Sequence, residues 1–66
     1  MERYLVLDWY EDPSEPEILG IDLTLDKAKA LREQRIEDTD GECDVTIHDN
    51  EMDWELYEEM YSRLYD

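Results

Sequence analysis

Cys43 and His48 are the residues whose types could support nucleophilic catalysis, since a histidine can activate a cysteine thiol. They are five positions apart in a segment with strand-like alternation, so their side chains are expected on opposite faces. A buried structural cysteine and a surface histidine are the favoured interpretation. One cysteine and one histidine also provide too few ligands for a zinc site.

The run from Asp38 to Gly41 has the composition of the centre of a calcium-binding loop. With Gly41 at loop position 6, positions 1 and 12 fall on Ile36 and Ile47, where such a loop requires oxygen donors. Carboxylate pairs are abundant, but abundance does not identify an acid and a base without a cleft. The sequence therefore predicts no enzyme, no catalytic residue, no cofactor and no metal site.

The segment from Glu37 to Glu59 is the most unusual part of the chain. Eleven of its 23 residues are acidic, and it contains neither lysine nor arginine. Apolar and aromatic residues nevertheless recur through it: Val45, Ile47, Met52, Trp54, Leu56 and Tyr57. A disordered acidic tail would lack this recurrence, so we expect a folded surface with a concentrated negative field.

Length and composition indicate a single acidic domain, residues 1–66. The formal net charge is −15, from 21 acidic and 6 basic residues, and self-repulsion at that charge opposes compaction. A chain of this size buries only about 60% of its unfolded surface, so the core is small. Two tryptophans and five tyrosines favour folding, because each buries a large area.

The single cysteine excludes an internal disulfide, and the N-terminal residues do not have the pattern of a signal peptide. No apolar run approaches the ~20 residues that span a bilayer. A cytoplasmic protein is expected. Direct binding to nucleic acid or to an anionic membrane is not expected, because both need clustered lysine and arginine.

Alternation and capping signals predict the element order β-β-α-β-α. The predicted strands are Arg3–Tyr10, Glu17–Leu23 and Cys43–His48, and the predicted helices are Leu25–Glu37 and Glu51–Leu64. Thr24 is the expected N-cap of the first helix, and Asp49 or Asn50 that of the second. The simplest packing is an α+β domain whose three-stranded sheet has the order 2-1-3, with both helices on one face.

The predicted strand faces follow from strict alternation. The face toward the helices should carry Leu5, Leu7, Trp9, Leu19, Ile21, Leu23, Cys43, Val45 and Ile47. The opposite, mixed face should carry Tyr4, Val6, Asp8, Tyr10, Ile18, Asp22, Asp44, Thr46 and His48, and is a candidate dimer surface. The last helix has more apolar surface than one core contact needs, which favours either a homodimer seam or a partner-binding edge.

Carboxylates four residues apart on a helix, or two residues apart on a strand, are spaced by about 6 to 7 Å along the element. Duplex DNA presents one charge per 3.4 Å of axis on each strand, so such rows can approximate a phosphate track. In size, charge and folded-looking acidity the chain resembles the DNA-mimic proteins that bacteriophages direct against host DNA-binding proteins. Members of that class share no motif; the resemblance is one of composition.

The resemblance implies a non-enzymatic inhibitor, made during host takeover, that acts in the host bacterial cytoplasm. It would occupy the basic DNA groove of a host DNA-binding protein, with the histone-like nucleoid protein HU as the best single target. The predicted partner-binding residues are Glu37, Asp38, Asp40, Glu42, Asp44, Asp49, Glu51, Trp54, Glu55, Glu58, Glu59 and Tyr61.

Two other functional classes remain open. One is an acidic adaptor or antitoxin-like partner of a basic protein that does not bind DNA. The other is a domain from a salt-loving organism, in which charge serves only solubility. Against the second, the chain has only two alanines, two valines and two glycines, and many leucines, isoleucines and tyrosines.

Overall fold

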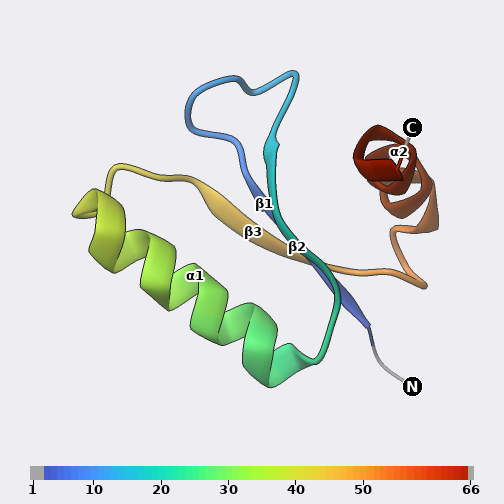
Figure 1. Ribbon diagram of the computed structural model, residues 1–66, viewed down its shortest axis with the longest axis horizontal. Helices are drawn as coiled ribbons and strands as arrows, with labels where there is room; N and C mark the ends of the chain where they lie inside the picture. Colours follow the sequence, from blue (N-terminus) through green and yellow to red (C-terminus); the bar gives the residue numbers. More distant parts are fainter. Residues whose placement is uncertain (1–2, 66) are drawn as a thin grey trace.

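The centre of the sheet is the short apolar run near the N-terminus. The computed structural model describes residues 3–65, with β1 (Tyr4–Asp8), β2 (Glu17–Leu23), α1 (Leu25–Thr39), β3 (Val45–Asp49) and α2 (Trp54–Tyr65). β1 lies between β2 and β3 and is antiparallel to both (Figure 1). The predicted α+β class and the strand order 2-1-3 are confirmed.

The helix ends differ from the predicted ones for local reasons. Thr24 caps α1 as predicted, because its side chain accepts a hydrogen bond from the Lys27 N–H (3.3 Å). α1 continues two residues past Glu37 and ends where Asp40 adopts a left-handed conformation (φ 55°). α2 begins at Trp54 rather than at Glu51, because residues 50–53 form a turn.

The two helices lie on opposite faces of the sheet, so the prediction that both share one face is wrong (Figure 1). Leu5 and Leu7 pack against Met60 of α2. Asp8, which points the other way from Leu7, is bound by Arg35 of α1. The reason is that Leu5, Val6 and Leu7 are all fully buried, so β1 has two apolar faces and each needs a cover.

Two irregularities in β2 overturn the predicted faces of that strand. β1 pairs with β2 as Leu7↔Ile18, Val6↔Gly20 and Tyr4↔Leu23, so β2 has an extra residue in each interval. Ile18 and Ile21 consequently both pack on the α2 side, against Leu5 and Leu7. Strict alternation had placed them on different faces.

The faces of β3 also differ from the prediction, because the register with β1 decides them. Val6 pairs with Ile47, whereas Leu7 pairs with Thr46 and Leu5 with His48. Paired residues of antiparallel strands point to the same face, so Thr46 and His48 lie on the α2 side. The face predicted as an open dimer surface, with Val6 and Asp8, is covered by α1.

Candidate functional site

Asp8 ties three parts of the chain together where β1 ends. Its carboxylate is 5% exposed and accepts hydrogen bonds from Arg35 Nε (2.8 Å) and from the N–H groups of Tyr10 (3.0 Å) and Asp44 (3.1 Å). Burial raises the pKa of Asp8, but these N–H groups and the Arg35 guanidinium outweigh burial and hold the pKa below its ordinary value of 3.8.

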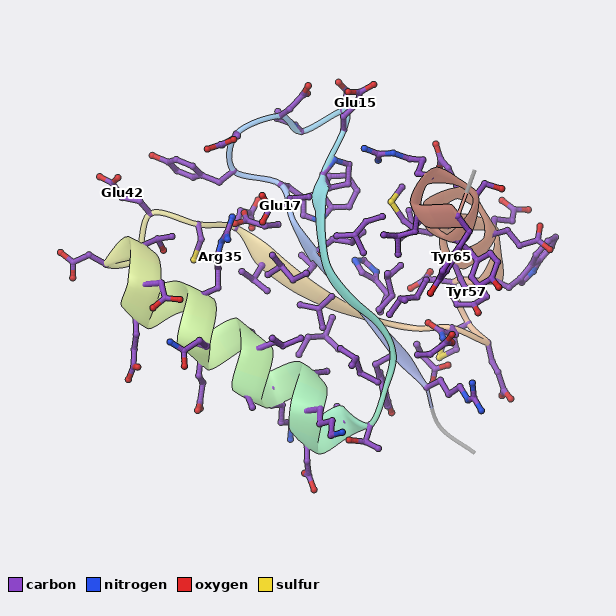
Figure 2. All side chains as sticks on the ribbon, in the orientation of Figure 1. Glu15, Glu17, Arg35, Glu42, Tyr57 and Tyr65 are labelled. Atoms are coloured by element: carbon purple, nitrogen blue, oxygen red, sulfur yellow. The ribbon has the colours of Figure 1, made fainter. Side chains whose placement is uncertain are left out.

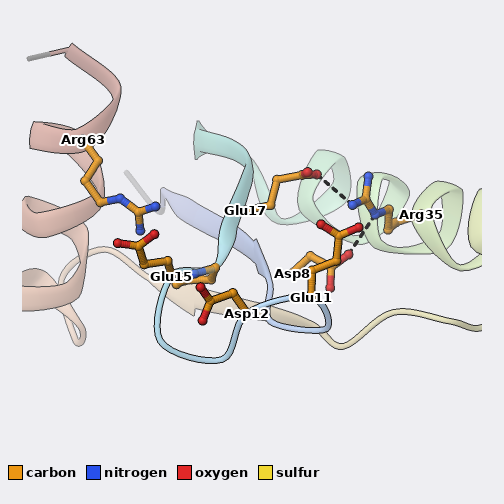
Figure 3. A pocket seen from close by; sticks show the side chains of 8 residues that line it. Asp8, Glu11, Asp12, Glu15, Glu17, Arg35 and Arg63 are labelled. Carbon is orange, nitrogen blue, oxygen red and sulfur yellow. Dashed lines mark hydrogen bonds and ion pairs between the residues drawn. The ribbon is translucent and has the colours of Figure 1, made fainter.

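Arg35 completes this link from α1. Its Nη2 atom lies 2.8 Å from Glu17 Oε2, so one guanidinium bridges the end of β1 and the start of β2 (Figure 3). The hydrogen bond with Asp8 and the charge of Glu17 raise the pKa of Arg35 despite partial burial. Arg35 faces the sheet, whereas its neighbour Ile36 is 40% exposed.

Topology gathers carboxylates around this link. β1 ends where β2 and β3 begin, so the loop between β1 and β2 meets the turn between α1 and β3. Nine acidic residues there are exposed: Glu11, Asp12, Glu15, Glu17, Glu37, Asp38, Asp40, Glu42 and Asp44. We call them the loop-end surface; Glu42 and Glu15 follow one edge of the molecule in Figure 2.

The four carboxylates from Glu11 to Glu17 were missing from the predicted site. They line, with Arg35 and Arg63, a cavity of about 160 Å³ (Figure 3). Asp12 orders the loop, since its Oδ1 accepts from the N–H (3.0 Å) and the hydroxyl (2.7 Å) of Ser14. These hydrogen bonds lower the pKa of Asp12. The antiparallel order 2-1-3 was the available signal, because it brings residues 11–17 beside residues 37–44.

A second anionic surface lies on α2, across the sheet. It consists of Glu51, Trp54, Glu55, Glu58, Glu59 and Tyr61, all exposed, and we call it the α2 surface. The predicted partner-binding residues therefore do not form one ridge: residues 37–44 join the loop end, and residues 51–61 lie on α2 and the turn before it (Figure 1). Asp49 belongs to neither, since it is half-buried and its Oδ1 accepts from the Glu51 N–H (2.8 Å).

Aromatic rings run along α2 beside its carboxylates. The ring centroids of Tyr57 and Tyr61 are 5.8 Å apart, and those of Tyr61 and Tyr65 are 4.6 Å apart. Trp54 is 55% exposed and Tyr65 67%. Figure 2 places Tyr57 and Tyr65 on the same side of the helix. This half of the molecule combines negative charge with exposed apolar area, as protein-binding surfaces often do.

A groove of about 500 Å³ opens at the first turn of α2, between that helix and the ends of β1 and β2. Its walls include Arg3, Asp22, Glu51, Trp54, Tyr57 and Glu58. Asp22 has a left-handed backbone (φ 57°) at the irregular part of β2. Its carboxylate accepts from Asn50 Nδ2 (3.1 Å) and from the Tyr57 hydroxyl (3.3 Å). Burial, together with Asp22, raises the pKa of Tyr57.

His48 belongs to a hydrogen-bonded chain on the α2 face. Thr46 Oγ1 accepts from Trp9 Nε1 (2.7 Å) and lies 2.7 Å from His48 Nε2, while His48 Nδ1 lies 3.2 Å from Asp53 Oδ2. Both ring nitrogens are thus occupied, and Cys43 is a half-buried free thiol. Within residues 3–65, no group of three or more histidine, cysteine or acidic side chains has an arrangement that could hold a metal ion.

Comparison with known proteins leaves this small anionic α+β domain without a match. No family model matches the chain, no curated protein sequence matches it, and no solved structure matches its fold. Over the described part of the chain, neither helix has the length and apolar character needed to cross a membrane.

Proposed function

We propose that this protein is a DNA mimic, which binds the basic DNA-binding groove of a host protein and competes with DNA. The observation that carries the proposal is the loop-end surface, where nine exposed carboxylates from two segments far apart in the sequence, residues 11–17 and 37–44, converge. Arg35 pairs with Asp8 and Glu17, so its single charge leaves most of these carboxylates unneutralised.

Charge density supports this proposal. The longest extent of the molecule is 30 Å, a length over which one strand of duplex DNA carries about nine phosphates. The loop-end surface supplies nine carboxylates at one end of the molecule, so its negative charge is at least as dense as that of one DNA strand. A basic groove that binds DNA without reading its sequence would therefore meet a similar number of negative charges. Association would be electrostatically steered and would weaken as salt rises.

Rigidity supports it as well. A mimic must hold its charges in place, because ordering a flexible acidic chain on binding would reduce the affinity. Asp8 and Arg35 connect the loop-end segments to the sheet, and Asp12 orders the β1–β2 loop. The nucleoid protein HU is the first target to test, because architectural proteins of its kind bind DNA with little sequence preference.

A gel shift tests the proposal directly. HU is bound to a non-specific duplex, the protein is added in increasing amounts, and the titration is repeated at rising salt. We expect free DNA to appear, with a midpoint that moves to higher protein concentration as salt increases. Persistence of the HU–DNA complex under a large excess of protein would reject HU as the target.

Two charge-reversal variants locate the binding surface. One changes Glu11, Glu15, Glu37 and Glu42 to Lys on the loop end. The other changes Glu51, Glu55, Glu58 and Glu59 to Lys at the α2 surface. Both alter the net charge equally, and all eight side chains are exposed. We expect the protein concentration needed to displace half of the DNA to rise at least tenfold more for the loop-end variant than for the α2 variant. Equal losses would mean that only total charge matters.

An acidic adaptor for a basic partner other than a DNA-binding protein is the second candidate. The tyrosine row on α2 favours it, since a polyanion mimic does not need exposed apolar area. A pull-down from bacterial lysate separates the two, through the DNA-binding activity of what is captured. Folding only in molar salt would instead favour a role for the charge in solubility.

A further inference from the structure

The groove beside the first turn of α2 has a charge imbalance that points to a cationic occupant. Three carboxylates, from Asp22, Glu51 and Glu58, line it against one guanidinium, from Arg3. Arg3 is already directed to Asp22, since its Nη1 lies 3.9 Å from Asp22 Oδ1. Within residues 3–65, no hydrogen bond or ion pair occupies the carboxylates of Glu51 and Glu58.

The same groove exposes an aromatic face. Trp54 is 55% exposed and lies one helical turn before Glu58, so the indole and that carboxylate are neighbours on the helix surface. Tyr57 forms another part of the wall and is held by Asp22, whose carboxylate accepts a hydrogen bond from the Tyr57 hydroxyl. An aromatic ring flanked by unpaired carboxylates is the arrangement that stabilises a cation through both its charge and its flat face.

Arginine fits these walls better than lysine. A planar guanidinium can stack on an indole while its N–H groups pair with carboxylates at the edges, whereas an ammonium acts as a compact, strongly hydrated charge. We propose that this groove binds an arginine side chain of a basic protein partner, stacked on Trp54 and paired with Glu51 and Glu58. The inference rests on the proposed function, in that the partner is the DNA-binding protein whose groove the loop end occupies.

The position of the groove makes it a contact separate from the loop-end surface. It lies on the side of the sheet opposite α1, at the end of β1 and β2 away from the loop-end carboxylates, so one partner would reach both surfaces through two distinct contacts. Charge attracts a partner over a distance, while a buried aromatic and arginine contact slows dissociation. The groove would thus select among basic proteins that the loop end alone attracts equally.

A short peptide tests the groove without any DNA-binding protein. Isotope-labelled protein is titrated with acetyl-Gly-Arg-Gly-amide, with the citrulline peptide as a neutral isostere and with the lysine peptide. We expect the arginine peptide to shift the Trp54 indole signal and the Glu51 and Glu58 amides, and to bind about tenfold tighter than citrulline. Equal shifts with citrulline, or shifts confined to the loop end, would overturn the inference.

Matched variants of α2 and the turn before it separate binding in the groove from the effect of net charge. Glu51→Gln with Glu58→Gln should lower the affinity for the arginine peptide about tenfold. Glu55→Gln with Glu59→Gln removes the same charge outside the groove and should lower that affinity less than twofold. All four side chains are exposed, so both variants should fold. Equal weakening by the two pairs would assign the effect to net charge and refute a built site.

The same two variants in the HU gel shift distinguish failure of this inference from failure of the proposed function. Peptide binding in the groove without any displacement of DNA supports the arginine site and rejects HU as the target of the mimic. Displacement of DNA that is equal for both variants supports the mimic and rejects the groove as its anchor. A weakening of displacement in the Glu51 and Glu58 variant alone, smaller than the weakening caused by the loop-end charge reversal, supports both.

Discussion

The two faces of the sheet are held by different forces. On the α1 face, the buried carboxylate of Asp8 binds Arg35 and two backbone N–H groups, and Gly20 allows Leu31 to approach β2 closely. On the α2 face, Leu5 and Leu7 pack against Met60 in an apolar cluster. One face is fixed by a charged link and the other by hydrophobic burial.

Because of this difference, the two candidate binding surfaces are positioned by different interactions. The loop-end carboxylates are positioned by the charged link, so their arrangement depends on a group that titrates. The helix that carries the aromatic groove is positioned by apolar packing, which salt and pH affect much less. Disturbing one face should therefore change one surface and leave the other intact.

The largest effect is expected from Asp8→Ala. The change leaves Arg35 without its main partner and removes the acceptor of two backbone N–H groups, so the free energy of unfolding should fall by about 3 kcal/mol. Urea unfolding measures the loss, and amide signals of residues 9–17 and 40–44 should broaden or shift most. Equal disturbance of the Leu5, Leu7 and Met60 signals would contradict the separation of the two faces.

Gly20→Ala should cost somewhat less, about 2 kcal/mol. A Cβ atom there would lie 2.5 Å from Leu23 Cδ1 and 2.8 Å from Leu31 Cδ1, so α1 must shift or those side chains must change rotamer. Gly41→Ala is the matched glycine control, because nothing lies within 4 Å of its added Cβ. Its cost, about 1 kcal/mol, arises from the left-handed backbone (φ 86°) alone. Thermal unfolding of the two variants measures both costs, and a Gly20→Ala variant as stable as the native protein would contradict the prediction.

Thr46→Val disturbs the polar part of the α2 face and should cost about 1 kcal/mol. The change leaves the Trp9 indole N–H and His48 Nε2 without their shared partner. The Trp9 indole proton should move in the NMR spectrum, while the Asp44 and Tyr10 amides that bind Asp8 stay in place. A shift of those amides would show that the two faces are coupled.

The smallest effect is the acid response of Asp8. Because its folded-state pKa lies below 3.8, its contribution to the free energy of unfolding is present above that pH and is lost as pH falls through the lower pKa. The stability difference between the native protein and Asp8→Asn should therefore narrow from pH 5 to pH 2.5. Urea unfolding at several pH values checks this, and a constant difference would mean that Asp8 does not titrate differently in the folded state.

Local patterns were sufficient to predict the element order, the strand order and the Thr24 cap. Each depends on neighbouring residues: alternation in Leu5–Leu7, turn residues between strands, and a threonine hydroxyl before a helix. The placement of the helices needed more. The run Leu5–Val6–Leu7 is apolar on both sides, which favours a strand that has a helix on each face. A prediction based on strict alternation assigns only one apolar face and so misses this feature.

The site was harder to predict because it depends on register and on irregular backbone. The irregularities of β2 turn Ile18 and Ile21 to one side and place Asp22 at the groove, and no local pattern marks them. The acidic segment 37–59 was contiguous in sequence, yet β3 carries its two halves to different surfaces. Charge along a chain therefore indicates how much negative potential exists, whereas topology decides where it gathers.

The central claim, that the loop-end carboxylates imitate a polyanion, is tested most directly by the HU gel shift with the two four-residue charge-reversal variants. The account predicts that the native protein displaces DNA, that displacement weakens with salt, and that the variant of Glu11, Glu15, Glu37 and Glu42 displaces it at least tenfold less well than the α2 variant. Undiminished displacement by the loop-end variant would contradict the account.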